Sequence, residues 1–251
     1  MKPVVSKTLE VGVRGRFGAA FGWSAALFRS GLHDDIQFIS SGGGAQPALT
    51  IFRMSARHGG KDSSWAWMRR PAPSRSAAHY SYIDATFRSP LILNSPNNST
   101  AAPLSCPTCT DIQIAAGNRI PSIPRHIFKV CVKWAPDLGV SVGASVLAQS
   151  SQFARGDENN ADVNGPVPGF AIVKLDARYR FGKRWELFGK IGNVFDRQYL
   201  TFGTLGQNVF TAPGHTFDTS GATWRNEQFR SFGAPRGAWI GIAYSFDDVP
   251  S

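Results

Sequence analysis

The chain has 251 residues, of which 42% are hydrophobic and 12% aromatic, and its formal net charge is +10 at pH 7. It contains no run of about 18 apolar residues, which argues against a transmembrane helix. Between residues 51 and 77, six basic residues stand against one acid, so this segment holds half of the net charge. A basic cluster confined to one atypical segment argues against a nucleic-acid-binding face, and we expect no nucleic-acid partner.

The first eight residues lack an apolar stretch and a small-residue cleavage site, so they do not read as a secretory signal peptide. Beyond them, strand-like segments follow one another along the chain. The clearest, 169–181, alternates between a mostly charged face and an apolar face, which is typical of a strand between lipid and a wet lumen. The nine predicted segments are 4–16, 22–40, a disturbed one near 50–68, 78–88, 124–135, 139–152, 169–181, 185–203 and 237–246.

The connections between these segments alternate in length. Short links are expected at 17–21, 136–138 and 182–184, and long ones at 89–123, 155–168 and 204–236. Short periplasmic turns and long extracellular loops on alternate sides are typical of an up-and-down membrane barrel. The pattern predicts an all-β fold: a partial antiparallel up-and-down transmembrane β-barrel of about nine strands.

Three cysteines allow at most one intramolecular pair. Cys106 and Cys109 form a C-x-x-C within the long loop 89–123, with no second pair at zinc spacing. We expect a loop disulfide or unpaired thiols there rather than a metal or redox site. Cys131 falls on a predicted strand, where it is expected to pack. We expect no catalytic residues, no cofactor and no metal.

The segment 237–246 has the most informative alternation. Five residues of one face are apolar, and the opposite face is mostly small; the apolar face comprises Ala238, Ile240, Ile242, Tyr244 and Phe246. Aromatic residues also lie near the ends of other predicted strands, where interfacial belts place them. Taken alone, this segment would also suit a half-buried strand of a soluble sandwich.

Two motifs near the C-terminus carry a family resemblance. Gly192-Asn193-Val194-Phe195-Asp196-Arg197-Gln198-Tyr199 precedes a long loop, and Gly233-Ala234-Pro235-Arg236-Gly237 then opens the strand that ends in Tyr244-Ser245-Phe246. This arrangement resembles the C-terminal end of TonB-dependent outer-membrane receptors, of the kind that take up siderophores. The resemblance marks Asn193, Phe195, Asp196, Tyr199, Pro235, Arg236, Tyr244 and Phe246 as structural motif positions.

The resemblance implies that residues 1–246 are the C-terminal part of a barrel whose complete form has 22 strands around a plug, and that 247–251 are a short tail. It implies an outer-membrane location, contact with membrane lipid and, in full-length relatives, TonB and a ferric siderophore or similar scarce solute as partners. A nine-strand piece leaves two open edges, so we expect it not to transport by itself. A passive porin-like channel is the alternative, and a soluble basic β protein a more distant one.

Residues 51–77 depart from this pattern. Ile51-Phe52-Arg53-Met54-Ser55-Ala56-Arg57-His58 can be back-translated so that the frame one base earlier reads Y-F-Q-N-V-G-A-T. Continued through Trp65 and Trp67, it yields R-R-Q-G-L-E-L-G-L-D, which has strand periodicity and resembles the family. We therefore predict two compensating frameshifts, near residues 49–51 and near Ala77.

Overall fold

The computed structural model describes residues 4–18, 20–39, 51–69, 74–136 and 139–246, with the backbone alone described at 34–39 and 51–69. In this part of the chain we find no helical segment with the length and hydropathy of a membrane span. The strands are β1 (Val5–Phe17), β2 (Phe21–Ile39), β3 (Ile51–Arg69), β4 (Ser74–Phe87), β5 (Leu91–Asn94), β6 (Asp111–Ile114), β7 (His126–Trp134), β8 (Val140–Gln149), β9 (Phe170–Phe181), β10 (Trp185–Gly192), β11 (Leu200–Asn208), β12 (Arg225–Phe232) and β13 (Gly237–Tyr244).

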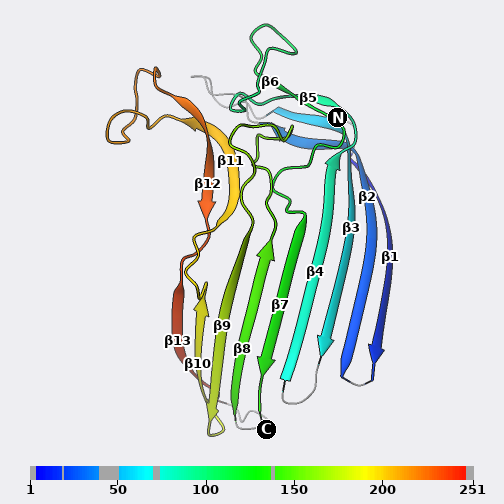
Figure 1. The fold of residues 1–251 in the computed structure, drawn as a ribbon, viewed down its shortest axis with the longest axis vertical. Helices are drawn as coiled ribbons and strands as arrows, with labels where there is room; N and C mark the ends of the chain where they lie inside the picture. The colour runs from blue at the N-terminus through cyan, green and yellow to red at the C-terminus, as the bar shows by residue number, and fades with distance from the viewer. Residues whose placement is uncertain (1–3, 19, 40–50, 70–73, 137–138, 247–251) are drawn as a thin grey trace.

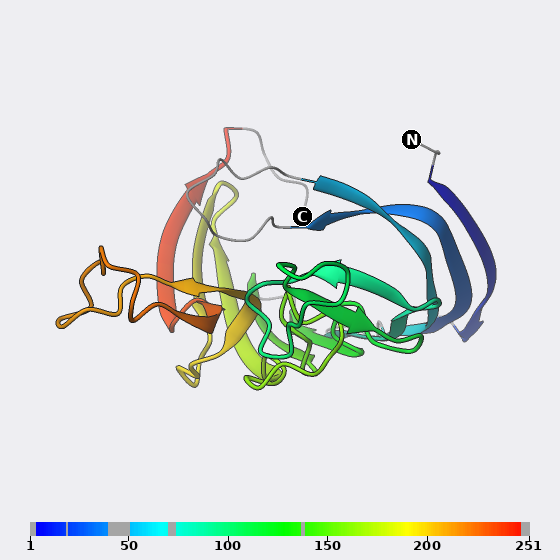
Figure 2. The ribbon, with the colours of Figure 1, turned by 90° about the horizontal axis from the view of Figure 1, so that it is seen from above.

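Nine of these strands form one antiparallel sheet in the order β1-β2-β3-β4-β7-β8-β9-β10-β13. Each strand of this sheet lies beside its neighbour in sequence, apart from the hairpins β5-β6 and β11-β12, which form separate sheets. The nine strands make a single-layered wall (Figure 1), and from above the wall is an open arc that ends at β1 and β13 (Figure 2). This is the predicted partial up-and-down barrel.

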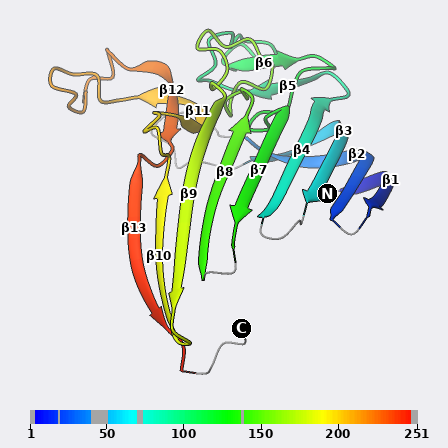
Figure 3. The same ribbon diagram turned by 60° about the horizontal axis from the view of Figure 1, so that its bottom comes forward.

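Long connections gather at one end of the wall (Figures 1 and 3). They follow β4, β8 and β10, whereas β9 and β10 are joined by a short turn at the other end. Both clusters of buried hydrophobic residues involve segments of this long-loop end: Phe87, Leu93, Ile112 and Ile114 form one, and Ala154, Val167 and Leu205 form the other.

The prediction of one strand over 185–203 is wrong beyond Gly192. β10 ends there, and β11 pairs with β12 rather than with the wall. The break has a local cause, because Asn193 and Asp196 both adopt positive φ angles, of 47° and 51°. Asn and Asp tolerate this left-handed conformation better than most residues, and it turns the chain away from the wall.

The backbone of residues 51–69 forms β3, which pairs along its length with β2 and β4. A strand therefore occupies the position that the frameshift hypothesis requires to be a strand. The frameshift itself stays a prediction, and the tail 247–251 lies outside the described residues.

Candidate functional site

Most of the large apolar residues of the wall that stay exposed face outward. Ile240 and Ile242 on β13 are 81% and 60% exposed, and Leu9 on β1 is 72% exposed. A single layer with such a face does not fit a soluble sandwich, in which the side chains would be covered by a second sheet. It fits a lipid-facing surface, to which the alternation also assigns Val11, Val13, Leu27, Val132, Leu187 and Ile191.

Aromatic rings form a continuous chain on this outer face at the short-turn end of β9, β10 and β13. Phe181 stacks on Trp185 with ring centroids 6.2 Å apart, Trp185 lies 4.8 Å from Tyr244, and Tyr244 lies 5.2 Å from Phe246. Amphipathic rings of this kind concentrate at the membrane–water boundary. The predicted motif positions Tyr244 and Phe246 thus belong to a row of aromatic rings that crosses three strands.

The inner face of β9 and β10 carries charges that are paired within the wall. Glu186 accepts hydrogen bonds from Arg178 at 3.1 Å and Arg180 at 3.0 Å. Four residues further along β10, Lys190 stands directly opposite Asp176 on β9. The inner face here is therefore polar, and its cations are partly compensated by acids of the same two strands: Lys174, Arg178, Arg180 and Lys190 stand against Asp176 and Glu186.

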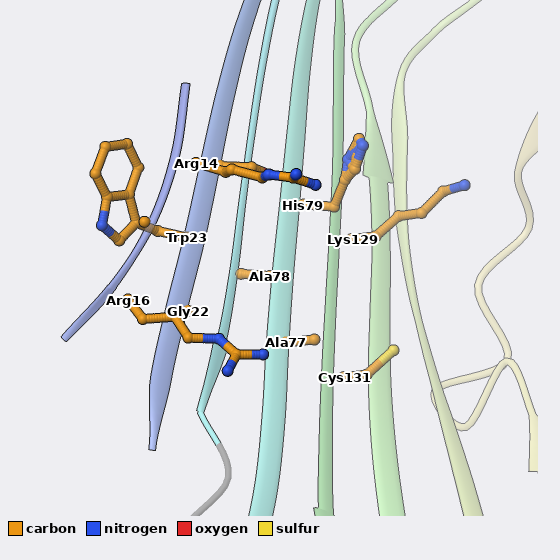
Figure 4. A pocket seen from close by; sticks show the side chains of 11 residues that line it. Arg14, Arg16, Gly22, Trp23, Ala77, Ala78, His79, Lys129 and Cys131 are labelled. Atoms are coloured by element: carbon orange, nitrogen blue, oxygen red, sulfur yellow. The ribbon is translucent and has the colours of Figure 1, made fainter. Parts of the chain in front are cut away.

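The inner face of β1, β4 and β7 is basic. Figure 4 shows Arg14, His79 and Lys129 pointing from these strands to the same side, whereas Trp23 points to the other. Together with Arg16 and Cys131 they line a cavity of about 840 Å³ that spans from β1 to β7. A cavity bounded by strands this far apart lies on the concave side of the arc, which is the lumen of a barrel. We call it the basic cavity.

Asn193 holds the corner where the chain leaves β10. Its side chain is almost fully buried, with the residue 4% exposed. The amide nitrogen Nδ2 donates to the carbonyl oxygens of Arg197 at 2.8 Å and Ala234 at 3.1 Å, while Oδ1 accepts from the backbone N–H of Arg197 at 3.0 Å. One side chain thereby satisfies three backbone groups and joins the two ends of the long connection.

The second half of the corner ties the two predicted motifs together. Asp196 Oδ1 accepts a hydrogen bond from the backbone N–H of Arg236 at 2.8 Å. The Tyr199 ring covers Gly233, where it leaves no space for a Cβ atom, and the Tyr199 carbonyl accepts from the Gly233 N–H at 2.8 Å. Phe195, by contrast, is 71% exposed. The structure thus brings Asn193, Asp196, Tyr199 and Arg236 together and leaves Phe195 outside the corner.

A second inner cavity, of about 520 Å³, lies below this corner. It is bordered by Pro235 and Tyr199 from the corner, by Trp239 from β13, and by Lys174 and Lys190 from the adjoining strands. Aromatic and cationic side chains on one wall can contact a solute through ring faces and charge at once.

At the long-loop end, two loops from different parts of the chain are joined by side-chain hydrogen bonds. Asn98 Nδ2 donates to the carbonyl oxygen of Gly156 at 3.0 Å, and Asp162 Oδ2 accepts from the N–H of Ser99 at 2.9 Å. Asp157, which is 1% exposed, accepts from the backbone of Ala161 and Asp162. Burial raises the pKa of Asp157, whereas hydrogen bonds lower the pKa of Asp162 despite opposing desolvation.

The loop after β4 also contains the C-x-x-C. The structure joins Cys106 and Cys109 by a disulfide, with Cα atoms 5.1 Å apart. It leaves Cys131 as a free, exposed thiol on the inner face, so the expectation that Cys131 packs is wrong. The disulfide closes a tight turn in which the Cys109 N–H donates to the Cys106 carbonyl at 3.1 Å.

Sequence reasoning missed the loop junction and the basic cavity. The junction depends on residues about 60 positions apart, such as Asn98 and Gly156, for which the sequence carries no pairing signal. The basic cavity had a usable signal, because Lys129 and His79 each lie on an alternating strand; only the pairing of β4 with β7 shows that they stand opposite each other.

A single-layered antiparallel wall with an apolar outer face and a polar inner face defines the class as a transmembrane β-barrel. The family profile described as TonB dependent receptor-like, beta-barrel matches residues 1–194. The chain belongs to this family, whose members are outer-membrane receptors rather than enzymes.

Solved structures of receptors share the fold. The siderophore receptor PiuA from Acinetobacter baumannii matches with a TM-score of 0.66 at 16% identity, over 95% of this chain and 28% of its own. The ferric yersiniabactin uptake receptor FyuA from Yersinia pestis matches with a TM-score of 0.63 at 15% identity, over 97% and 30%. The copper transporter OprC matches with a TM-score of 0.64 at 16% identity, over 98% and 32%. No curated protein matches the sequence.

The chain therefore spans less than a third of the length of these receptors. The family match ends at residue 194, so the corner from Phe195 to Arg236 is supported by the fold alone.

Proposed function

We propose that this chain is the C-terminal part of the barrel of a TonB-dependent outer-membrane receptor. The receptor would take up a large, scarce solute, such as a ferric siderophore, with energy delivered through TonB. The observation that carries the proposal is the nine-stranded, two-faced wall, which together with the family match accounts for the lipid face, the polar inner face and the clustered long loops.

The same wall supports the proposal that the chain alone does not transport. Within the described residues, β1 pairs only with β2 and β13 only with β10, so each presents one open edge. Lipid does not tolerate unpaired backbone groups at such an edge. Closing the barrel would require further strands between β13 and β1, and these strands would bury both edges.

The test is to direct the full chain to the outer membrane behind a signal peptide and to measure channel formation in planar bilayers. We expect no discrete conductance from the chain alone. Stable single channels would overturn the receptor proposal in favour of the porin-like alternative. Reading about 1.5 kilobases of DNA upstream provides the second arm, because the receptor proposal requires a plug and further barrel strands to be encoded there.

A further inference from the structure

The outer face of β4 and β7, which are neighbours in the wall (Figure 1), carries a row of rings at the long-loop end of these strands. Alternation sets Tyr80 and Tyr82 of β4 on this face, opposite Phe128 and His126 of β7. The Tyr80 hydroxyl lies 2.8 Å from His126 Nδ1, and the Tyr82 ring centroid lies 5.2 Å from that of His126. Rings that combine an apolar body with a polar tip concentrate at the membrane–water boundary. This row therefore marks one edge of the lipid-facing band.

The opposite edge of the band lies at Trp134, the last residue of β7, which is on the same face as His126 and is exposed. At about 3.3 Å per residue, the strand covers about 26 Å between these two residues. That length is comparable with the apolar band of about 25 Å in outer-membrane barrels. Phe128 and Val132 stay exposed between the two edges. Residues just beyond His126 on the long-loop side therefore lie at the level of lipid headgroups.

Two arginine side chains lie at this level, next to Asp84 of β4. Arg125 Nη2 donates to Asp84 Oδ1 at 3.1 Å, and the Arg125 side chain stays partly exposed. The backbone of Arg119 pairs with that of Thr86, which alternation places on the same outer face as Asp84. The Arg119 guanidinium carbon lies 5.5 Å from the centroid of the Phe153 ring, a cation–π contact that holds the side chain in place.

The two guanidinium groups are close enough to affect each other. Burial and the neighbouring charge of Arg125 lower the pKa of Arg119, whereas the charge of Asp84 acts in the opposite direction. A phosphate monoester carries about two negative charges near pH 7 and three terminal oxygens. Guanidinium groups bind such oxygens through paired N–H···O bonds. A phosphate beside both arginines would therefore offset their mutual repulsion.

We propose that Arg119 and Arg125 bind the phosphate monoester of a lipid headgroup, whose acyl chains lie along Phe128 and Val132. The two arginines are on the outer face of the wall, so their ligand is a lipid rather than a solute in the lumen. Binding at this site requires only that the wall crosses a membrane, whatever solute the receptor takes up. Its absence would therefore leave the proposed uptake function standing.

The experiment is native mass spectrometry of the full chain, refolded in a nonionic detergent and titrated with dioleoyl phosphatidic acid. Dioleoyl phosphatidylcholine is the control lipid, because it has the same acyl chains but carries a phosphate diester beside a cationic choline group. We expect phosphatidic acid to bind at least about tenfold more tightly, and this preference to fall as ammonium acetate is raised. The double variant Arg119→Gln, Arg125→Gln should lose about tenfold in affinity for phosphatidic acid.

The matched control is Arg225→Gln, Arg230→Gln, which removes the same charge from β12, outside the wall, and should stay within about twofold of the parent. The single variant Arg119→Gln keeps the ion pair between Arg125 and Asp84 and should lose about threefold. Circular dichroism of each variant verifies that the strand content is retained. Equal binding of the two lipids by the folded parent, or an Arg119→Gln, Arg125→Gln variant that binds as tightly as the parent, overturns the proposal.

Glycerol phosphate distinguishes a lipid from a free phosphate, because it carries the same monoester without acyl chains. We expect it to displace phosphatidic acid only at a concentration at least about a hundredfold above that of the lipid. Displacement at equal concentration would overturn the assignment to a lipid, since the acyl chains would then contribute nothing. Each of these outcomes is separable from the conductance measurement above, which reports channel formation and not lipid binding.

Discussion

The inner face of the wall is charged along its width, but the charged side chains are arranged differently in its two halves. On β9 and β10, Glu186 lies between Arg178 and Arg180, and Lys190 stands opposite Asp176, so the charges are partly compensated within the strand pair. On the inner face of β1, β4 and β7, the described side chains hold more cations than acids, and Arg75 stands directly opposite Lys133. The first half therefore holds ion pairs of its own, whereas in the second half the register sets Arg75 against Lys133.

The compensated half also contains the corner, and this gives the largest predicted effect. Asn193→Ala removes three hydrogen bonds to backbone groups around a residue that is 4% exposed. We expect it to lower the free energy of unfolding by about 2–3 kcal/mol, measured by urea unfolding of the full chain in detergent. Asn193→Gly allows the positive φ but does not restore the hydrogen bonds, so it should recover only a fraction of the free energy of unfolding that Asn193→Ala loses. Full recovery would show that the backbone conformation matters and the hydrogen bonds do not.

Glu186→Gln tests the charge compensation directly. It leaves Arg178 and Arg180 without their shared counter-charge, and because both guanidinium groups are substantially exposed we expect a loss of about 1 kcal/mol. The same unfolding measurement at low and at high salt checks the cause. An unchanged stability at low salt would contradict the view that this half depends on its internal ion pairs.

Placing one new acid in each half should change stability with opposite signs. His79→Glu places an acid opposite Lys129 and should stabilise the chain by about 0.5 kcal/mol, whereas Lys190→Glu places a second acid opposite Asp176 and should destabilise it by a similar amount. The difference in urea midpoint between the two variants is the readout. Two shifts of the same sign would remove the distinction between the halves.

The smallest expected effect concerns the two loops that are joined to each other at the long-loop end of the wall. Because the pKa of Asp157 is raised above its ordinary value of 3.8, the stabilisation from its protonated form is complete below that value and is lost as pH rises through the higher folded pKa. Asp162, whose pKa is lowered, acts in the opposite direction. We expect local stability to change by a few tenths of a kcal/mol.

Hydrogen exchange of the peptide 156–163, corrected for intrinsic rates, measures that change. Protection attributable to Asp157 should be greater near pH 4.5 than near pH 7.5, because the folded loop favours the protonated form of its carboxyl group. In Asp157→Asn this component should vanish, leaving only the Asp162 component. Identical pH profiles in the parent and this variant would show that Asp157 does not contribute.

Much of the wall was predictable because lipid and lumen impose a period of two on each strand. The residues of β9 and β13 show that period clearly, and both strands lie within a few residues of their predicted bounds. The division after Gly192 was not predicted, since apolar and polar residues continue through the corner. The left-handed positions at Asn193 and Asp196 were the available signal, because both are residue types that favour such turns.

The hairpins β5-β6 and β11-β12 were not predicted, and the reason is different. β5, β6 and β12 fall in connections predicted as continuous loops, and β11 begins inside the predicted strand 185–203. The packing of Leu205 on β11 against Ala154 and Val167 joins distant segments of the chain. Local periodicity does not report such packing. The motif positions Asn193, Asp196, Tyr199 and Arg236 were found through resemblance, and only the structure places them in one corner.

The arrangement of the three cysteines makes the molecule chemically addressable. Cys106 and Cys109 are consumed in their disulfide, and Cys131 remains on the inner face beside Lys129. A charged, lipid-insoluble maleimide would therefore react with one thiol of this chain, that of Cys131, from the inner face of the wall. Its rate of attachment would report how accessible the inner face of the wall is to water.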